Sequence, residues 1–131
     1  MSSPNFLTPA KSARGLGSAK SGTGHYIRQR VSAIALLFLV PWFMYAMMQA
    51  VQGGYAGATD WVSQPLNAAL LILTAGAAFY HMRLGMQAVI EDYIAKHGTR
   101  TALLILNTFA VIALSLAVIL AVLKIWIGAG A

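Results

Sequence analysis

The first group of residues whose types could do chemistry is a histidine followed, at fixed spacing, by an aspartate and a tyrosine. His81 lies inside the apolar run 66–90, and Asp92 and Tyr93 follow at its end. An unpartnered polar group in hydrocarbon is costly, so an imidazole at membrane depth needs a partner. A hydrogen-bonded histidine between helices, a haem ligand, another metal ligand and a proton relay are all open interpretations.

The spacing of these residues predicts that they share one side of a helix. His81, Gly85 and Asp92 fall on one face at 3.6 residues per turn. The rise of about 1.5 Å per residue separates His81 from Asp92 by about 16 Å along the axis. His81 is therefore within the hydrocarbon, and Asp92 and Tyr93 are at the water interface, where tyrosines collect in any case. Gly85 leaves room either for a flat ligand or for a neighbouring helix.

Basic residues form a second group of candidates. His25, Arg28 and Arg30 precede the first apolar block. Membrane topology alone can explain Arg28, whereas Arg30 begins the hydrophobic segment and could reach an anionic group below the surface. Arg83 lies inside the second block, where we expect it to snorkel to the interface or to pair with an acid of a partner. Arg83 and Glu91 receive no specific role.

The elements that position these residues follow from composition. The chain has 131 residues, 59% hydrophobic and 9% charged, against about 25% charged residues in an average soluble domain. Each of the apolar blocks 31–51, 66–90 and 102–127 is near the ~20 residues that cross ~30 Å of hydrocarbon. We predict an all-α membrane protein with three transmembrane helices at about 28–52, 65–96 and 101–128. Pro41 should kink the first helix, and the third is assigned only packing and lipid contact.

Charge is distributed by membrane side. Lysines and arginines precede the first span and lie in the connection between the second and third spans, whereas the only charged residue of segment 52–64 is Asp60. The positive-inside rule therefore predicts a cytoplasmic N-terminus and a C-terminus on the opposite side. This sorting explains the formal net charge of +6 better than nucleic-acid binding does. In the cytoplasmic connection, Lys96-His97-Gly98 marks a turn at which Gly98 is expected to end the second helix.

The remaining features concern the ends of the chain and its location. Residues 1–24 are basic, lack acids and apolar blocks, and are expected to be flexible; residues 25–131 form the membrane anchor. The absence of cysteine excludes iron–sulfur ligation by this chain. We expect a multi-pass protein of a bacterial inner membrane, although residues 1–24 also share features with an organellar transit peptide.

Two segments together resemble the hydrophobic membrane anchor subunit of succinate dehydrogenase, respiratory complex II. The resemblance covers nearly the whole chain as a three-helix topology, and its specific part is the following pair of motifs: Gly24-His25 with Gln29-Arg30-Val31-Ser32-Ala33-Ile34, and His81-x3-Gly85-x6-Asp92-Tyr93.

The resemblance implies a subunit that is not catalytic by itself. It implies that the chain and a partner cytochrome b subunit anchor the flavoprotein and iron–sulfur subunits, with electrons passing from succinate to ubiquinone. His81 matches an axial ligand to a shared b-type haem. Arg30 and His25 match residues near the haem propionates or the quinone pocket, and Tyr93 and Asp92 match the quinone-binding tyrosine and its adjacent acid. Quinol:fumarate reductases share this organisation, so the direction of the reaction stays open.

Two other functions compete with this one. A small multidrug or proton-coupled transporter would more naturally carry a carboxylate within the membrane, and the three acids here lie at interfaces or in a loop. A structural subunit of another respiratory complex would use His81 only for packing. A haem spectrum that depends on His81 distinguishes the first interpretation from these two.

Overall fold

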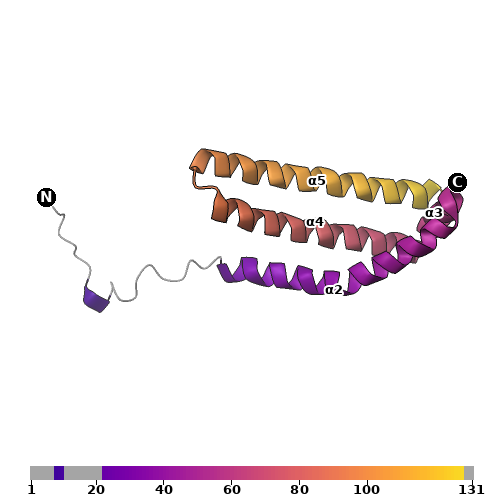
Figure 1. Cartoon of the computed structure of the whole chain (residues 1–131), viewed down its shortest axis with the longest axis horizontal. Helices are drawn as coiled ribbons and strands as arrows, with labels where there is room; N and C mark the ends of the chain where they lie inside the picture. Colours follow the sequence, from indigo (N-terminus) through magenta and orange to yellow (C-terminus); the bar gives the residue numbers. More distant parts are fainter. Residues whose placement is uncertain (1–7, 11–21, 129–131) are drawn as a thin grey trace.

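Helices make up almost all of the described chain. The computed structural model describes residues 8–10 and 22–128, and Figure 1 shows its helices, which are α2 (Gly22–Gln52), α3 (Gly54–Ser63), α4 (Pro65–Tyr93) and α5 (His97–Gly128). Three of these helices, α2, α4 and α5, are long and apolar enough to cross a membrane. The predicted all-α fold with three membrane-spanning helices is confirmed.

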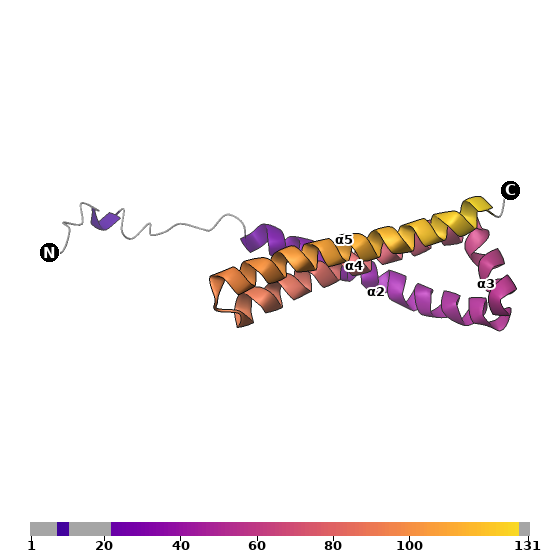
Figure 2. The same ribbon diagram turned by 90° about the horizontal axis from the view of Figure 1, so that it is seen from above.

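The central helix is α4, which packs against both α2 and α5. In the described residues α2 and α5 do not pack directly on one another. The start of α2 and the turn between α4 and α5 lie at one end of the molecule, and α3 and the end of α5 lie at the other (Figure 1). From above, α4 and α5 run close together while α2 diverges from them (Figure 2). The positions of His81, Asp92 and Tyr93 are thus all carried by the central helix.

Helix boundaries differ from the expected ones at three points. Residues 22–24, expected in the flexible segment 1–24, belong to α2, while residues 1–7 and 11–21 of that segment lie outside the described residues. The second span ends at Tyr93 and not near residue 96, and the third begins at His97 and not near residue 101. Gly98 lies inside α5, so the expectation that it ends a helix was wrong. The Lys96 carbonyl already accepts a hydrogen bond from the Arg100 amide at 2.9 Å, which begins the new helix.

The connection between the first two spans contains a helix that sequence patterns did not predict. α2 ends at Gln52, and Gly54 adopts a φ of 62°, which a residue with a side chain rarely tolerates. A Cβ at Gly53 would lie 2.7 Å from the Gly57 Cα, so this turn is tight. The turn lets α3 form at once, and Pro65 then begins α4 at a position that proline favours.

Pro41 and an aromatic pair shape the end of the molecule that α3 closes. Pro41 lies within α2, and Figure 1 shows α2 changing direction in its second half. A proline has no amide hydrogen and clashes with the preceding turn, which accounts for the bend. Trp42 then meets Trp61 of α3, with ring centroids 6.0 Å apart. Trp61 therefore packs within the protein, whereas Tyr55 is exposed.

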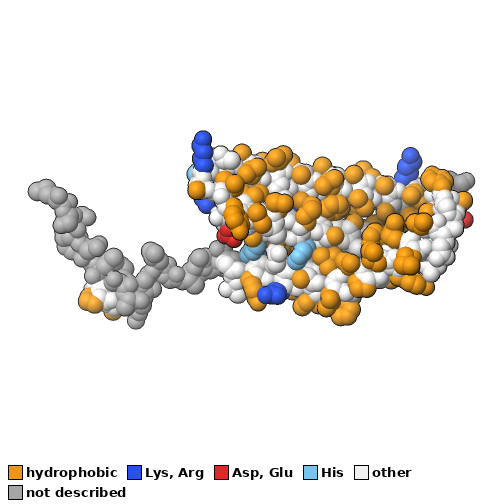
Figure 3. All heavy atoms as spheres, viewed as in Figure 1, with side chains coloured by type: hydrophobic (Ala, Val, Ile, Leu, Met, Phe, Trp, Pro, Cys, Tyr) orange, Lys and Arg blue, Asp and Glu red, His pale blue; other side chains and the backbone are white. Residues whose placement is uncertain are grey.

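The interior is small and the apolar surface is large. The buried apolar side chains are few and include three alanines, whose size allows helices to approach closely. Hydrophobic side chains cover most of the face shown in Figure 3, and charged groups lie mainly toward its two ends. This distribution suits a protein surrounded by lipid and by other membrane subunits.

Candidate functional site

His81 is held against α2 by a hydrogen bond within the α2–α4 interface. Its Nδ1 lies 2.9 Å from the Ser32 Oγ, and that Oγ donates to the Gln29 carbonyl oxygen at 2.9 Å. Among residues 8–10 and 22–128, Ser32 is one of two buried polar residues, with 6% of its surface exposed. Since α2 and α4 both carry this contact, the orientation of the imidazole depends on how the two helices pack.

The other ring nitrogen of His81 is available to a further partner. Within the described residues His81 Nε2 has no hydrogen bond, and it is absent from the buried atoms that lack one, so it reaches the surface of the helix pair. No group of three or more histidine, cysteine, aspartate or glutamate side chains comes together among these residues to hold a metal ion. A lone accessible imidazole nitrogen fits an axial haem ligand better than a metal held by this chain alone.

Polar groups continue along the interface toward the start of α2. We call His25, Gln29, Ser32 and His81 the polar seam. Residues 25, 29 and 32 lie at intervals of four and three, which places them on one face of α2. His25 Nε2 and Gln29 Oε1 are buried and have no hydrogen-bond partner within the described chain. Since buried polar atoms normally have a partner, His25 and Gln29 are the groups of the seam that are open to a further one.

Gly85 brings the two helices together at the seam. A Cβ at Gly85 would lie 3.7 Å from the Gln29 Nε2, an ordinary contact distance. Gly85 therefore faces α2. Of the two interpretations offered by the sequence, this position fits close helix contact, as small residues provide in membrane bundles. Space for a flat ligand is not what lies over Gly85.

Arg30 lies on the exposed side of α2. Its guanidinium carbon lies 5.1 Å from the centroid of the Tyr26 ring, one turn back on the exposed side of α2. Arg28 is also exposed, and its Nε donates to the Gly24 carbonyl oxygen at 3.2 Å. Of the basic candidates before the first span, the structure brings His25 into the polar seam and leaves Arg30 on the surface.

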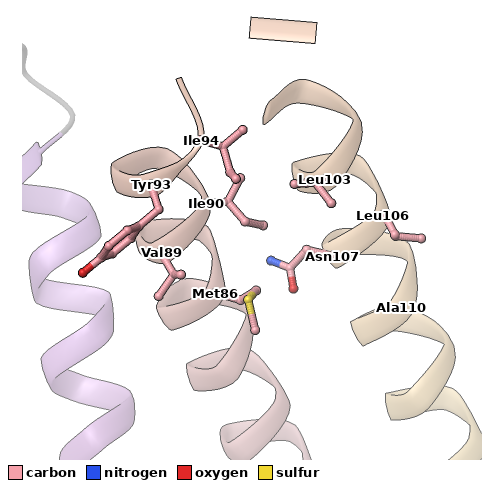
Figure 4. A pocket seen from close by; sticks show the side chains of 9 residues that line it. All are labelled: Met86, Val89, Ile90, Tyr93, Ile94, Leu103, Leu106, Asn107 and Ala110. Carbon is pink, nitrogen blue, oxygen red and sulfur yellow. The ribbon is translucent and has the colours of Figure 1, made fainter. Parts of the chain in front are cut away.

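Asp92 and Tyr93 are exposed at the end of α4. Tyr93 has 82% of its surface exposed and lies at the edge of a pocket of about 310 Å³ between α4 and α5. Figure 4 shows its hydroxyl pointing away from this pocket toward the α2 side, whereas Asn107 points into it. Asp92 has no ion pair or hydrogen bond within the described residues, and Glu91 accepts a hydrogen bond from Gln87 at 2.8 Å. The Asp92 carboxylate and the Tyr93 hydroxyl are therefore both accessible to a molecule outside this chain.

The third span takes part in polar contacts that sequence analysis missed. Asn107 donates to the Arg83 carbonyl oxygen at 3.1 Å, and the Arg83 Nε donates to the Thr108 Oγ1 at 3.4 Å. Arg83 therefore has a partner on α5 in addition to any outside the chain. The signal was the adjacent pair Asn107-Thr108 inside an otherwise apolar run, because polar side chains within a membrane bond across helices.

Comparison with known proteins identifies the family. A model of the succinate dehydrogenase/fumarate reductase transmembrane subunit matches residues 5–127. The chain belongs to this family. It is 35% identical over 103 residues to a Rickettsia conorii protein named succinate dehydrogenase hydrophobic membrane anchor subunit, covering 78% of this chain and 82% of the relative. A Paracoccus denitrificans protein with the same name is 32% identical over 124 residues, covering 95% of each. No solved structure matches the chain significantly.

Membership of the succinate dehydrogenase family confirms the resemblance based on the two motifs. The bacterial relatives are membrane anchor subunits, and this chain has three membrane-spanning helices, so the expected location as a multi-pass protein of a bacterial inner membrane is also confirmed. A small transporter and a subunit of an unrelated respiratory complex are no longer needed as explanations.

Proposed function

We propose that the chain is the membrane anchor subunit of a succinate:quinone oxidoreductase, without a complete active site of its own. It would bind a partner cytochrome b subunit in the membrane and hold the iron–sulfur and flavoprotein subunits at the cytoplasmic face. The observation that carries this proposal is an imidazole at membrane depth, held by Ser32 with its second nitrogen at the surface, in a chain of this family. The large exposed apolar surface supports binding to partner subunits and lipid.

The proposed orientation places the start of α2 and the turn at residues 94–96 on the cytoplasmic side. These two regions lie at the same end of the molecule (Figure 1), and Arg28, Arg30, Lys96 and Arg100 belong to that end. The C-terminal end of α5 lies on the other side of the membrane. Asp92 and Tyr93 then face the side on which the peripheral subunits bind.

In the proposed haem site, the Nε2 of His81 would hold the iron of a b-type haem shared with the partner cytochrome b subunit. The haem would contribute one-electron redox chemistry within the membrane. Arg30 and His25 are proposed to bind the haem propionates or to border the quinone pocket. A guanidinium suits carboxylates and an imidazole N–H can donate to one. The guanidinium of Arg30 is exposed, and the Nε2 of His25 has no hydrogen-bond partner within the described chain.

In the proposed quinone site, the hydroxyl of Tyr93 donates a hydrogen bond to a carbonyl oxygen of ubiquinone. Reduction adds two electrons and two protons to the quinone, and negative charge develops on that oxygen as electrons arrive. The hydrogen bond therefore strengthens during the reaction. Asp92, exposed beside Tyr93, is proposed to support the tyrosine or to supply protons from water. The rest of the pocket would come from partner subunits.

The haem assignment is tested by replacing His81 with alanine in the complete complex. The reduced b-type haem band should disappear in His81→Ala, because a ligand to the iron is lost. His97→Ala is the matched control, since His97 is exposed at the start of α5 and far along the chain from the polar seam. A complex that lacks haem with His81 intact, or that keeps an unaltered band in His81→Ala, would contradict the assignment.

A further inference from the structure

The hydrogen bonds around Ser32 determine which nitrogen of His81 carries the proton. A serine hydroxyl has one hydrogen and two acceptor lone pairs. The Ser32 Oγ lies 2.9 Å from the Gln29 carbonyl oxygen and 2.9 Å from the His81 Nδ1. A carbonyl oxygen can only accept, so both contacts are hydrogen bonds only when the hydroxyl hydrogen points at Gln29. The Oγ is then the acceptor for His81, and Nδ1 carries the hydrogen.

We infer that Ser32 is a positioning residue that fixes His81 as the Nδ1-protonated tautomer and directs the lone pair of Nε2 toward a metal outside the chain. The inference rests on the proposed haem ligation by His81. Iron binds the unprotonated nitrogen of a neutral imidazole, and the hydrogen bond made by the other nitrogen sets the tautomer and ring orientation. Ser32 itself touches neither the haem nor the quinone.

Burial makes this contact stronger than a similar one in water. Ser32 has 6% of its surface exposed, so water does not compete for its hydroxyl. The position also depends on two helices, because the acceptor is on α2 and the imidazole is on α4. Any other rotation of the imidazole would leave the Ser32 acceptor site without its partner in a region where a lost hydrogen bond is costly.

The hydrogen bond should also adjust the redox behaviour of the bound iron. Donating Nδ1–H to an acceptor increases the electron density on the imidazole and raises its basicity as a ligand. A more basic ligand favours the ferric over the ferrous state, so removing the acceptor should raise the midpoint potential. Each tenfold change in the ratio of ferric to ferrous affinity corresponds to about 59 mV for a one-electron couple.

The test compares substitutions of Ser32 in the purified complex by haem content per complex and by midpoint potential. In Ser32→Ala we expect a haem affinity lower by about tenfold or more, together with a higher potential. Ser32→Thr keeps the hydroxyl and should resemble the original complex. Thr74→Val is the matched control, because Thr74 is also buried, with 7% exposed, and its hydroxyl bonds within the described chain only to the Leu70 carbonyl oxygen, at 2.7 Å.

The outcomes separate this inference from the haem assignment on which it rests. Haem that depends on His81 but keeps its content and potential in Ser32→Ala would overturn the role of Ser32 alone. Absence of haem from the complex with both residues intact would overturn the haem assignment. If Ser32→Ala does not assemble, Ser32→Cys provides a weaker acceptor of similar size, for which a raised potential supports the inference and an unchanged one overturns it.

Discussion

Two residues of α4 have different proposed roles at different depths in the membrane. His81 is held within the membrane by a contact to α2, whereas Tyr93 is largely exposed at the end of the same helix. The two residues are twelve positions apart, which is about 18 Å of helix. One rigid helix therefore fixes the separation between the proposed haem ligand and the proposed quinone donor.

Replacing Tyr93 with phenylalanine should impair quinone reduction selectively. The change removes the hydroxyl and keeps the ring, so a hydrogen bond to an oxygen that becomes charged is lost, at a cost of about tenfold or more in rate. Succinate oxidation by an artificial soluble acceptor should be largely unchanged. The measurement compares both activities, with Tyr55→Phe as a control at an exposed tyrosine of α3. Equal loss of both activities would indicate a defect of assembly.

The sequence identifies a candidate functional side chain when that side chain is polar and lies within an apolar span, because placing a polar group in hydrocarbon costs free energy. His81 was identified in this way, and Asn107 could have been. Ser32 was not identified as a contact of His81, because a serine near the start of a span has many possible partners. The contact depends on how α2 and α4 lie against one another, which puts the Ser32 Oγ 2.9 Å from the His81 Nδ1.

At the scale of elements, the contact between α2 and α4 controls the polar seam. Gly85 allows that contact because its missing side chain leaves room for Gln29. Ala46, Ala50 and Ala68 are also buried. Small residues let membrane helices pack closely, and Gly85 provides such a position four residues from His81, whose Nδ1 lies 2.9 Å from the Ser32 Oγ.

Enlarging Gly85 should therefore affect haem binding through helix packing. Gly85→Ala places a Cβ at an ordinary distance of 3.7 Å from Gln29 Nε2 and should be tolerated. Gly85→Leu adds atoms that must displace Gln29, at a cost of about 1–3 kcal/mol, and should lower both haem content and the melting temperature of the complex. The two variants are compared by haem absorbance and thermal unfolding. Leucine tolerated as well as alanine would show that α2 and α4 do not need this contact.

For the whole molecule, orientation in the membrane is the property on which the proposed assembly depends. The turn at residues 94–96 and the start of α2 lie together at one end, and α3 lies at the other (Figure 1). The lysines and arginines before α2 and around that turn favour a cytoplasmic location for the first end under the positive-inside rule, which is the orientation proposed above. The flavoprotein and iron–sulfur subunits would dock at that end.

The chain has no cysteine, so single introduced cysteines can test this orientation. Asp60→Cys in α3 should react with a membrane-impermeant thiol reagent in intact spheroplasts, because the proposed orientation places α3 on the outside of the inner membrane. Ala95→Cys should react only in inverted vesicles stripped of peripheral subunits. Both positions are exposed in this chain. Labelling of Ala95→Cys but not Asp60→Cys in spheroplasts would reverse the orientation.

The sequence by itself determined the class of fold, the three spans and the residues that are costly in lipid. Hydrophobic length and the cost of burying a polar group are properties of short stretches of chain, which is why they can be recognised without a structure. α3, the start of α5 at His97, the pairing of Ser32 with His81 and the direction of the Tyr93 hydroxyl were decided by tertiary structure. These features depend on how separate helices rotate and approach one another, and no single segment of the chain contains that information.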